Sequence, residues 1–290
     1  MSVFVAEELS EVLNTKVVIG RINMGLLNRI IIDDVLLDDQ SGQEMLKVTR
    51  LSAKFDIMPF FKGKISISSV QLFGFNINLR KETPDSPPNF KFVLDAFASK
   101  DTVKKENSLD LRINSILIRR GRMSYHVLSE EETPGKFNAK HIQLQNIIAN
   151  ISLKALSKDS LNLGIKRLSL DEKASGFSLK KMSLKLVANN KQTNIDNFTI
   201  ELPETSLKLD TIHLEYDSLK AFDRFTEQVH FSFRTLPSQV TLKDISPFVP
   251  ILSHFKEPVT LDMEASTRCV CIWNPFRTFG QYPRSRFFSA

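Results

Sequence analysis

The sequence predicts a mainly β fold, a curved antiparallel sheet with a few short helices. First, runs of about 10–14 residues with alternating apolar and polar side chains follow one another along most of the 290-residue chain. Such alternation is typical of strands with one buried and one solvated face, and these favour antiparallel pairing. Second, clusters of Asn, Asp, Gly, Lys or Ser separate the runs, as turns do. Third, few helical patterns lie between the runs, which disfavours a parallel α/β fold.

The composition is that of a globular protein, with 42% hydrophobic and 25% charged residues. No apolar run reaches the roughly 18 residues of a membrane-spanning helix, and the first residues lack the basic region of a signal peptide. The formal net charge is +6, but without the four arginines after Ser266 it falls to +2. A nucleic-acid surface needs clustered Lys and Arg on the folded body, so nucleic-acid binding is not expected.

The first element is a helix over residues 2–13, where Val5, Leu9 and Val12 form one stripe and three glutamates face away. The stripe fits a packed terminal helix. It also fits the last turns of a longer, membrane-anchored helix that begins upstream. We describe residues 1–15 as an amphipathic N-terminal helix.

Strand patterns follow at 16–23, 28–39 and 44–57, with a turn at 39–42. In the third of these runs the apolar parity changes near Arg50, which predicts a β-bulge at that point.

The longest alternating stretch is residues 65–79. A phase shift at 68–72 predicts a bulge or bend, and Gly74 marks a second place for one. One set of side chains is expected to face the inside of the curved sheet: Ile65, Ile67, Phe73, Phe75, Ile77 and Leu79. The other set is expected to face water: Lys64, Ser66, Asn76, Asn78 and Arg80.

Beyond this stretch the sequence predicts a proline-rich loop, a helix at 89–99, and strands from residue 108 to 216. A helical turn at 217–227, a further strand and a proline-bounded helix at 246–255 complete the main region, residues 16–265. The tail, residues 266–290, holds both cysteines, the single Trp and four Arg, but no acidic residue and no strand alternation. We expect a non-native end that is poorly ordered and does not extend the sheet.

Residue types that carry chemistry form no familiar constellation. No HExxH, GxSxG, P-loop or GxGxxG motif occurs, and His141 and His213 are expected at the surface. The two cysteines stand two residues apart and offer half of the four ligands of a structural zinc site. The paired aspartates at 33–34 and 38–39 fit turns and sheet edges. We therefore expect no catalytic residue, no metal site and no cofactor.

Several short motifs follow one another after the N-terminal helix. They are V-x-I-G-R-I at 17–22, V-L-L-D at 35–38, V-x-R-L-S-A at 48–53, P-x-x-x-G-K at 59–64 and I-x-I-x-x-V-x-L at 65–72. In this order they resemble the N-terminal region of AsmA/TamB-type envelope proteins, most of all the Bacteroidetes TamB-like group. Segments 175–216 and 238–252 resemble later units, so the resemblance covers about residues 3–265.

The resemblance implies that the sheet forms an open, taco-like apolar groove without enzymatic activity. Proteins of this type carry phospholipid, or assist outer-membrane protein assembly, between the inner and outer membranes. It thus implies phospholipid acyl chains as partners, and the periplasmic face of the inner membrane as the location. A membrane anchor before the first helix and a far longer chain belong to the family pattern and do not occur in this sequence.

The residues themselves leave two explanations of the apolar face open. It lies against a second sheet or a helix, as in a sandwich, or it lines the groove. In a groove the lining continues onto later strands at Ile142, Leu144, Phe177, Leu179, Leu207 and Leu209. The alternative function is a β-rich interaction module that assists outer-membrane protein assembly or secretion by strand addition. A carbohydrate-active enzyme would need two converging carboxylates, which no pattern places.

Overall fold

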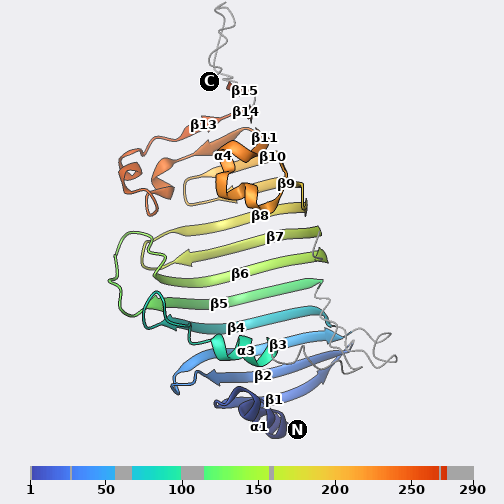
Figure 1. Cartoon of the computed structure of the whole chain (residues 1–290). Coiled ribbons are helices and arrows are strands. Elements are labelled where there is room, and N and C mark those ends of the chain that lie inside the picture. Colours follow the sequence, from blue (N-terminus) through green and yellow to red (C-terminus); the bar gives the residue numbers. More distant parts are fainter. Residues whose placement is uncertain are drawn as a thin grey trace, which may run out of the picture.

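The computed structural model describes residues 2–26, 28–55, 67–98, 114–156, 160–267 and 269–272. Within them, 15 strands form one sheet, and 13 of these follow one another across it in the order β1 to β11, β14 and β15. Figure 1 shows a ladder that rises from β1 near the N-terminus to β15 near the C-terminus. The sheet is curved and unclosed, with β1 and β15 at opposite edges. The prediction of a mainly β fold with few short helices is confirmed.

The strands largely match the alternating runs of the sequence. Their bounds are β1 (Val17–Gly25), β2 (Arg29–Asp38), β3 (Glu44–Phe55), β4 (Ile67–Lys81), β5 (Ser115–Val127), β6 (His141–Leu156), β7 (Ser160–Glu172), β8 (Ser178–Asn189), β9 (Gln192–Glu201), β10 (Ser206–Tyr216), β11 (Val229–Thr235), β12 (Ser238–Val240), β13 (Val259–Leu261), β14 (Met263–Ser266) and β15 (Cys269–Ile272). The short strands β12 and β13 form a side branch next to β10.

One neighbouring pair is parallel, so the sheet is mixed rather than wholly antiparallel as predicted. β4 and β5 run in the same direction, with Leu72 beside Ile118 and Ile77 beside Met123. A parallel pair needs a long crossover connection. The chain between these strands supplies it, and the helix α3 (Lys91–Ala98) lies on this crossover.

A kink crosses the middle of the sheet from strand to strand. At the kink, five residues have a left-handed backbone conformation with φ between 52° and 65°: Asp34, Gly74, Arg120, Asn146 and Asn197. These residues lie inside β2, β4, β5, β6 and β9 rather than at strand ends. At Gly74 a side chain would not fit, because a Cβ there would lie 2.7 Å from the Thr49 hydroxyl.

The kink reverses the apolar parity of the strands, because two successive side chains point away from the apolar face at this place. In β3, Val48 and Leu51 are three residues apart, yet both belong to one apolar cluster. Thr49 and Arg50, which lie between them, are exposed. The same spacing recurs between Leu72 and Phe75 in β4 and between Leu144 and Ile147 in β6. Since residues from both sides of the kink pack together, the apolar face is the concave one.

The three predicted irregularities have different outcomes. The bend predicted at Gly74 is confirmed, because the kink passes through this residue. The bulge predicted near Arg50 is wrong, because Arg50 pairs with Asp33 and Phe73 in unbroken register and the parity change comes from the kink. The irregularity predicted at 68–72 is confirmed as a bulge at Ser68. There Lys54 pairs with Ser69, and the next residue of β3 pairs with Ile67.

The described helices lie at the two ends of the sheet. α1 (Ser2–Leu13) packs on β1 and α3, and these two helices confirm the predictions at 2–13 and 89–99. Val5 and Leu13 of α1 pack in the core, whereas Leu9 and Val12 are exposed, so the predicted stripe only partly matches the buried side. At the other end, η2 (Leu219–Arg224) and α4 (Phe225–Gln228) pack against β11 and confirm the helical turn at 217–227.

The helix predicted at 246–255 is confirmed only in part. One 3-10 helix, η4 (Pro250–His254), lies inside this range, and a second, η3 (Leu242–Ile245), lies before it. Pro250 lacks a backbone N–H and disfavours helical geometry at Val249, whose φ and ψ are −132° and 86°. An α-helix therefore cannot run through this segment.

The sheet extends into the tail, contrary to the prediction. β15 pairs antiparallel with β14, with Val270 beside Ala265 and Ile272 beside Met263. The edge of β14 and two β-branched residues, Val270 and Ile272, are sufficient to form a four-residue strand, although the sequence here has no alternating run that predicts one. Residues 273–290 lie outside the described residues, and the prediction of poor order there stays untested.

Candidate functional site

An unbroken row of apolar side chains crosses the concave face, perpendicular to the strands. Each member is the direct Cα partner of the next, from β1 to β10. We call these ten residues the long apolar row: Ile22, Ile32, Leu51, Leu72, Ile118, Ala149, Leu168, Met182, Ile200 and Leu207. At about 4.8 Å between neighbouring strands, the row is roughly 43 Å long. All of its members except the buried Ala149 are partly exposed.

A second row of eight apolar residues runs beside the first. It consists of Met24, Ile30, Ala53, Val70, Ile116, Ile151, Ile165 and Leu184, again paired strand by strand. On each strand the second row stands two or three residues from the first. Together the rows form a band two side chains wide and free of polar members over eight strands.

The ring of Phe75 fills the kink. Only 7% of this residue is exposed, and it packs with Val48 and Ile147. Gly121 of β5 makes room for the ring, because a Cβ at Gly121 would lie 2.4 Å from the ring atom Cζ of Phe75. Without a side chain at this glycine, the ring reaches the backbone of β5 and closes the floor of the concave face.

Helices cover the N-terminal end of the apolar face. Phe92 and Val93 of α3 and Leu13 of α1 pack in one cluster with Leu37 of β2 and Met45 of β3. Figure 1 shows β5–β8 in the middle of the ladder with none of the described helices over them. Within the described residues, the middle of the apolar face therefore has no helical cover.

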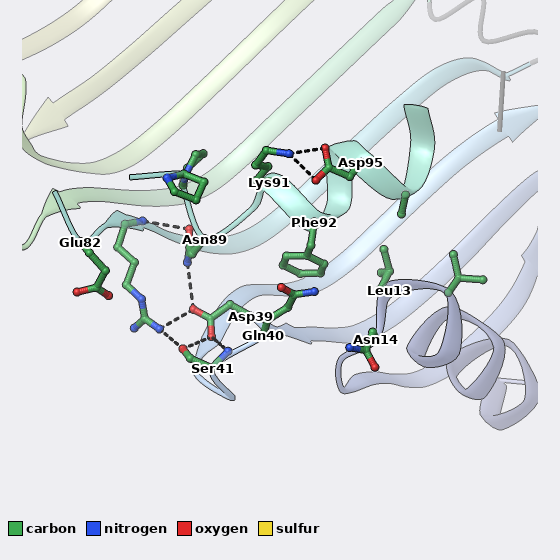
Figure 2. Close-up of a pocket in the computed structure, with 15 residues that line it drawn as sticks. Leu13, Asn14, Asp39, Gln40, Ser41, Glu82, Asn89, Lys91, Phe92 and Asp95 are labelled. Atoms are coloured by element: carbon green, nitrogen blue, oxygen red, sulfur yellow. Dashed lines mark hydrogen bonds and ion pairs between the residues drawn. The ribbon is translucent and has the colours of Figure 1, made fainter. Parts of the chain in front are cut away.

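A buried carboxylate fixes the segment before α3 to the sheet (Figure 2). Asp39 accepts hydrogen bonds from the backbone N–H groups of Ser41 and Gln43 at 3.0 and 3.1 Å and from the Asn89 amide at 3.2 Å. The Arg80 guanidinium lies 2.7 Å from the carboxylate. Burial raises the pKa of Asp39, but the bonds from Ser41, Gln43 and Asn89 and the charge of Arg80 outweigh it, so the pKa lies below its ordinary 3.8. The ionised carboxylate thereby joins the β2–β3 turn to the crossover.

A second buried carboxylate, Glu172, interrupts the apolar side chains on the other side of the kink. On that side, Ile77, Met123 and Leu144 are successive Cα partners in a row of apolar residues that starts in the first hairpin. The row ends at β7, because the partner of Leu144 on that strand is Glu172. Burial raises the pKa of Glu172. Hydrogen bonds from the Ser175 hydroxyl and three backbone N–H groups lower it by more than burial raises it, so the pKa lies below its ordinary 4.5. The apolar surface on this side of the kink is therefore less continuous than the surface on the side of the long apolar row.

Most of the predicted groove residues lie on the concave face. Leu207 belongs to the long apolar row, and the cluster at the kink contains Phe75, Ile77 and Leu144. Leu79 and Ile142 are the two partners of Tyr125. Leu179 and Leu209 are buried and pair with Leu170 and Phe198. Ile67 pairs with Phe55, whereas Ile65, Lys64 and Ser66 lie outside the described residues.

Phe73 does not lie on the predicted face. It is 39% exposed on the convex face, where the Arg120 guanidinium lies 5.2 Å from the ring centroid. The left-handed turn at Gly74 is the reason, because it shifts the parity of β4 by one residue and brings Leu72 inside instead.

Four other predicted positions also differ. Arg80 was expected in water, but its ion pair with Asp39 leaves only 19% of its side chain exposed. Asn78 is partly buried and donates a hydrogen bond to the Glu44 carbonyl at 3.1 Å; Asn76 is likewise only partly exposed. Phe177 lies in the turn before β8, edge-on to Phe248 at 5.0 Å, and belongs to neither row.

The convex side of the kink is polar. Asp33 and Arg50 form an ion pair at 2.6 Å, and the hydrogen bond from Arg50 holds the pKa of Asp33 below its ordinary 3.8. The expectation that this aspartate pair occupies a strand end is thus wrong, since residues 33–34 lie mid-strand at the kink. On β7 the equivalent residues Lys166 and Arg167 are exposed.

Sequence reasoning missed nine of the ten members of the long apolar row. A signal was present, because apolar residues recur three apart around two residues that face outward. Examples are Ile19–Ile22, Ile32–Val35, Val48–Leu51 and Ile165–Leu168. This spacing resembles one helical turn, but here it marks a kinked strand.

No protein-family model and no curated protein sequence matches this chain. Of the helices in the described part, none has both the length and the apolar content that a membrane crossing requires.

Proposed function

We propose that this chain is the N-terminal part of a non-enzymatic cell-envelope protein whose apolar face conducts phospholipid acyl chains between the inner and outer membranes. The observation that carries the proposal is the long apolar row, which is partly exposed along about 43 Å. This length exceeds the roughly 30 Å of bilayer hydrocarbon that two opposed acyl chains span.

The chemistry of the row suits an acyl chain. A contiguous apolar surface of this extent needs a partner or a ligand. An acyl chain gains about 0.8 kcal/mol for each CH₂ removed from water and requires no hydrogen bond in return. Since each strand offers a similar side chain, a bound chain has no strongly preferred position, and movement along the row is inexpensive.

The location in this proposal, the periplasmic face of the inner membrane, is what the resemblance to AsmA/TamB-type proteins implies. The polar convex face, with exposed Arg50, Lys166 and Arg167, suits an aqueous compartment on that side of the sheet.

Neighbouring residues on opposite faces give a sharp test. A photo-crosslinking amino acid is placed at Leu72 on the concave face or at Phe73 on the convex face of β4. The full chain is incubated with vesicles of phosphatidylethanolamine and phosphatidylglycerol, irradiated, and examined by mass spectrometry. We expect lipid adducts at position 72 and few at 73, and the same contrast between Leu168 and Arg167 in β7. Equal capture on both faces, or no capture at 72 and 168 in folded protein, contradicts the proposal.

The second candidate is the strand-addition module. One observation favours it, since within the described residues β15 lies at an edge of the sheet. Crosslinks to a client protein from β15, together with no lipid capture at position 72, would favour this function over lipid conduction.

A further inference from the structure

Two histidines face each other across the β5–β6 hairpin. His126 and His141 are direct Cα partners, and their Nδ1 atoms lie 3.0 Å apart. His141 was expected at the surface but is only 5% exposed. The sequence separates the two residues by 15 positions, so only the hairpin brings them together.

The hydrogen bonds of His141 orient one lone pair toward its partner. Nε2 of His141 lies 2.9 Å from the backbone carbonyl of Glu130. A carbonyl only accepts, so Nε2 carries the hydrogen, and in the neutral ring Nδ1 has a free lone pair directed at His126. An imidazole fixed through one nitrogen by a backbone carbonyl, with the other nitrogen free, is the usual arrangement of a metal-binding histidine.

A carboxylate completes a set of three ligand atoms. Glu132 Oε1 lies 3.8 Å from His126 Nδ1, and the three atoms all lie within 4.8 Å of one another. Among the described residues, no other trio of His, Cys, Asp or Glu side chains meets this condition. Ligands at about 2.0–2.1 Å from a tetrahedral zinc ion stand roughly 3.3 Å apart. The two nitrogens therefore need to separate by only a few tenths of an ångström, and Glu132, which is largely exposed, is free to approach.

The neighbouring cations are directed elsewhere. Arg80 is the strand partner of His126, but its guanidinium is bound to Asp39. Lys140 precedes His141, and its ammonium group lies 2.6 Å from the carboxylate of Glu130. The charge repulsion that a metal ion would meet at this place is therefore small.

We propose that His126, His141 and Glu132 bind a divalent transition-metal ion, with Zn²⁺ as the best match to two imidazoles and one carboxylate. The ion takes the place of the proton shared between the two Nδ1 atoms, and the hydrogen of His126 moves to its outer nitrogen Nε2. Water occupies the fourth position. The bound ion joins the start of β6 to the end of β5 and to the hairpin loop. This site is independent of the lipid-binding proposal, because none of its ligands belongs to the apolar rows.

Zinc binding to the full chain tests the proposal, with competition against a chromophoric chelator as the readout. We expect one ion per chain in the wild type. His126→Gln is expected to weaken binding by about 100-fold or more and Glu132→Gln by at least about 10-fold, as for the loss of groups that hold a metal. His213→Gln is the matched control, because His213 lies 3.0 Å from the Glu215 carboxylate but has no second imidazole. It should leave the affinity unchanged.

A second readout separates this site from the cysteines. Cobalt(II) bound by nitrogen and oxygen ligands shows d–d absorption without the sulfur charge-transfer band that Cys269 and Cys271 would produce. Zinc should also raise the unfolding midpoint of the wild type and of His213→Gln, but not that of His126→Gln. Absence of a stoichiometric ion, a sulfur band, or equal affinity in His126→Gln would each overturn the proposal.

Discussion

The contact between Gly121 and Phe75 makes a quantitative prediction about the floor of the concave face. In Gly121→Ala the new methyl group would lie 2.4 and 2.5 Å from two atoms of the Phe75 ring and 3.0 Å from the Ile147 Cβ. Phe75 is buried between Val48 and Ile147, so the ring has little room to move.

The expected cost follows from two opposing effects. Overpacking of a core typically costs about 1–3 kcal/mol, whereas replacement of glycine by alanine at a compatible φ stabilises by about 0.4–1 kcal/mol through the unfolded chain. We expect a net loss of about 1–2 kcal/mol. For a chain of this size the unfolding midpoint should fall by roughly 2–8 °C.

Thermal unfolding followed by circular dichroism measures the loss, and a double-mutant cycle assigns it. If the clash is the cause, Phe75→Leu should remove most of the effect of Gly121→Ala, with a coupling energy of about 0.5–3 kcal/mol. Gly164→Ala is the control, because its new methyl group would meet mainly the Ser152 hydroxyl, at 2.6 Å, and that small side chain can rotate away. A midpoint for Gly121→Ala equal to the wild type, or strict additivity with Phe75→Leu, would refute the reasoning.

Three further predictions concern the buried carboxylates and the apolar face. The folded-state pKa values of Asp39 and Glu172 lie below 3.8 and 4.5, so their stabilisation is fully present above these values and is lost as the pH falls through the lower folded-state values. The unfolding midpoint should therefore drop below about pH 4.5, less steeply in Glu172→Gln; equal slopes in acid titrations of both proteins would contradict this. Asn89→Ala removes bonds to the Asp39 carboxylate and to a β4 carbonyl, and should cost about 2–3 kcal/mol in urea unfolding; a loss below about 0.5 would be inconsistent with the anchor. Leu72→Lys should reduce co-purified lipid measured by mass spectrometry while Phe73→Lys should not, because only the first places a charge on the apolar face.

The sequence predicts most of the fold and a bend at Gly74, but it does not predict that the kink crosses the neighbouring strands as well. Alternation reveals strands wherever inner residues stand two apart, as in Phe75, Ile77 and Leu79. At the kink they stand three apart, and a strict period of two then assigns Phe73 to the wrong face. The φ angle that causes the change is a property of Gly74 within a pairing register, and register depends on strands distant in sequence.

Non-local pairing accounts for the other differences. The parallel alignment of β4 and β5 depends on the long crossover between them, and β15 forms because β14 offers it an edge. The meeting of His126 and His141 likewise depends on hairpin register rather than on motif spacing.

The pairing of successive strands also determines how the free energy of local opening varies along the sheet. From β1 to β11 each described strand pairs with the strands that precede and follow it in the sequence, so the sheet resembles a one-dimensional array in which an interior strand is stabilised by two interfaces. The two end strands have one interface each, and opening should start there and proceed inward. Amide hydrogen exchange should thus rise from the interior strands toward β14. The same logic makes length adjustable: one more hairpin adds about 10 Å to the sheet and leaves its cross-section unchanged.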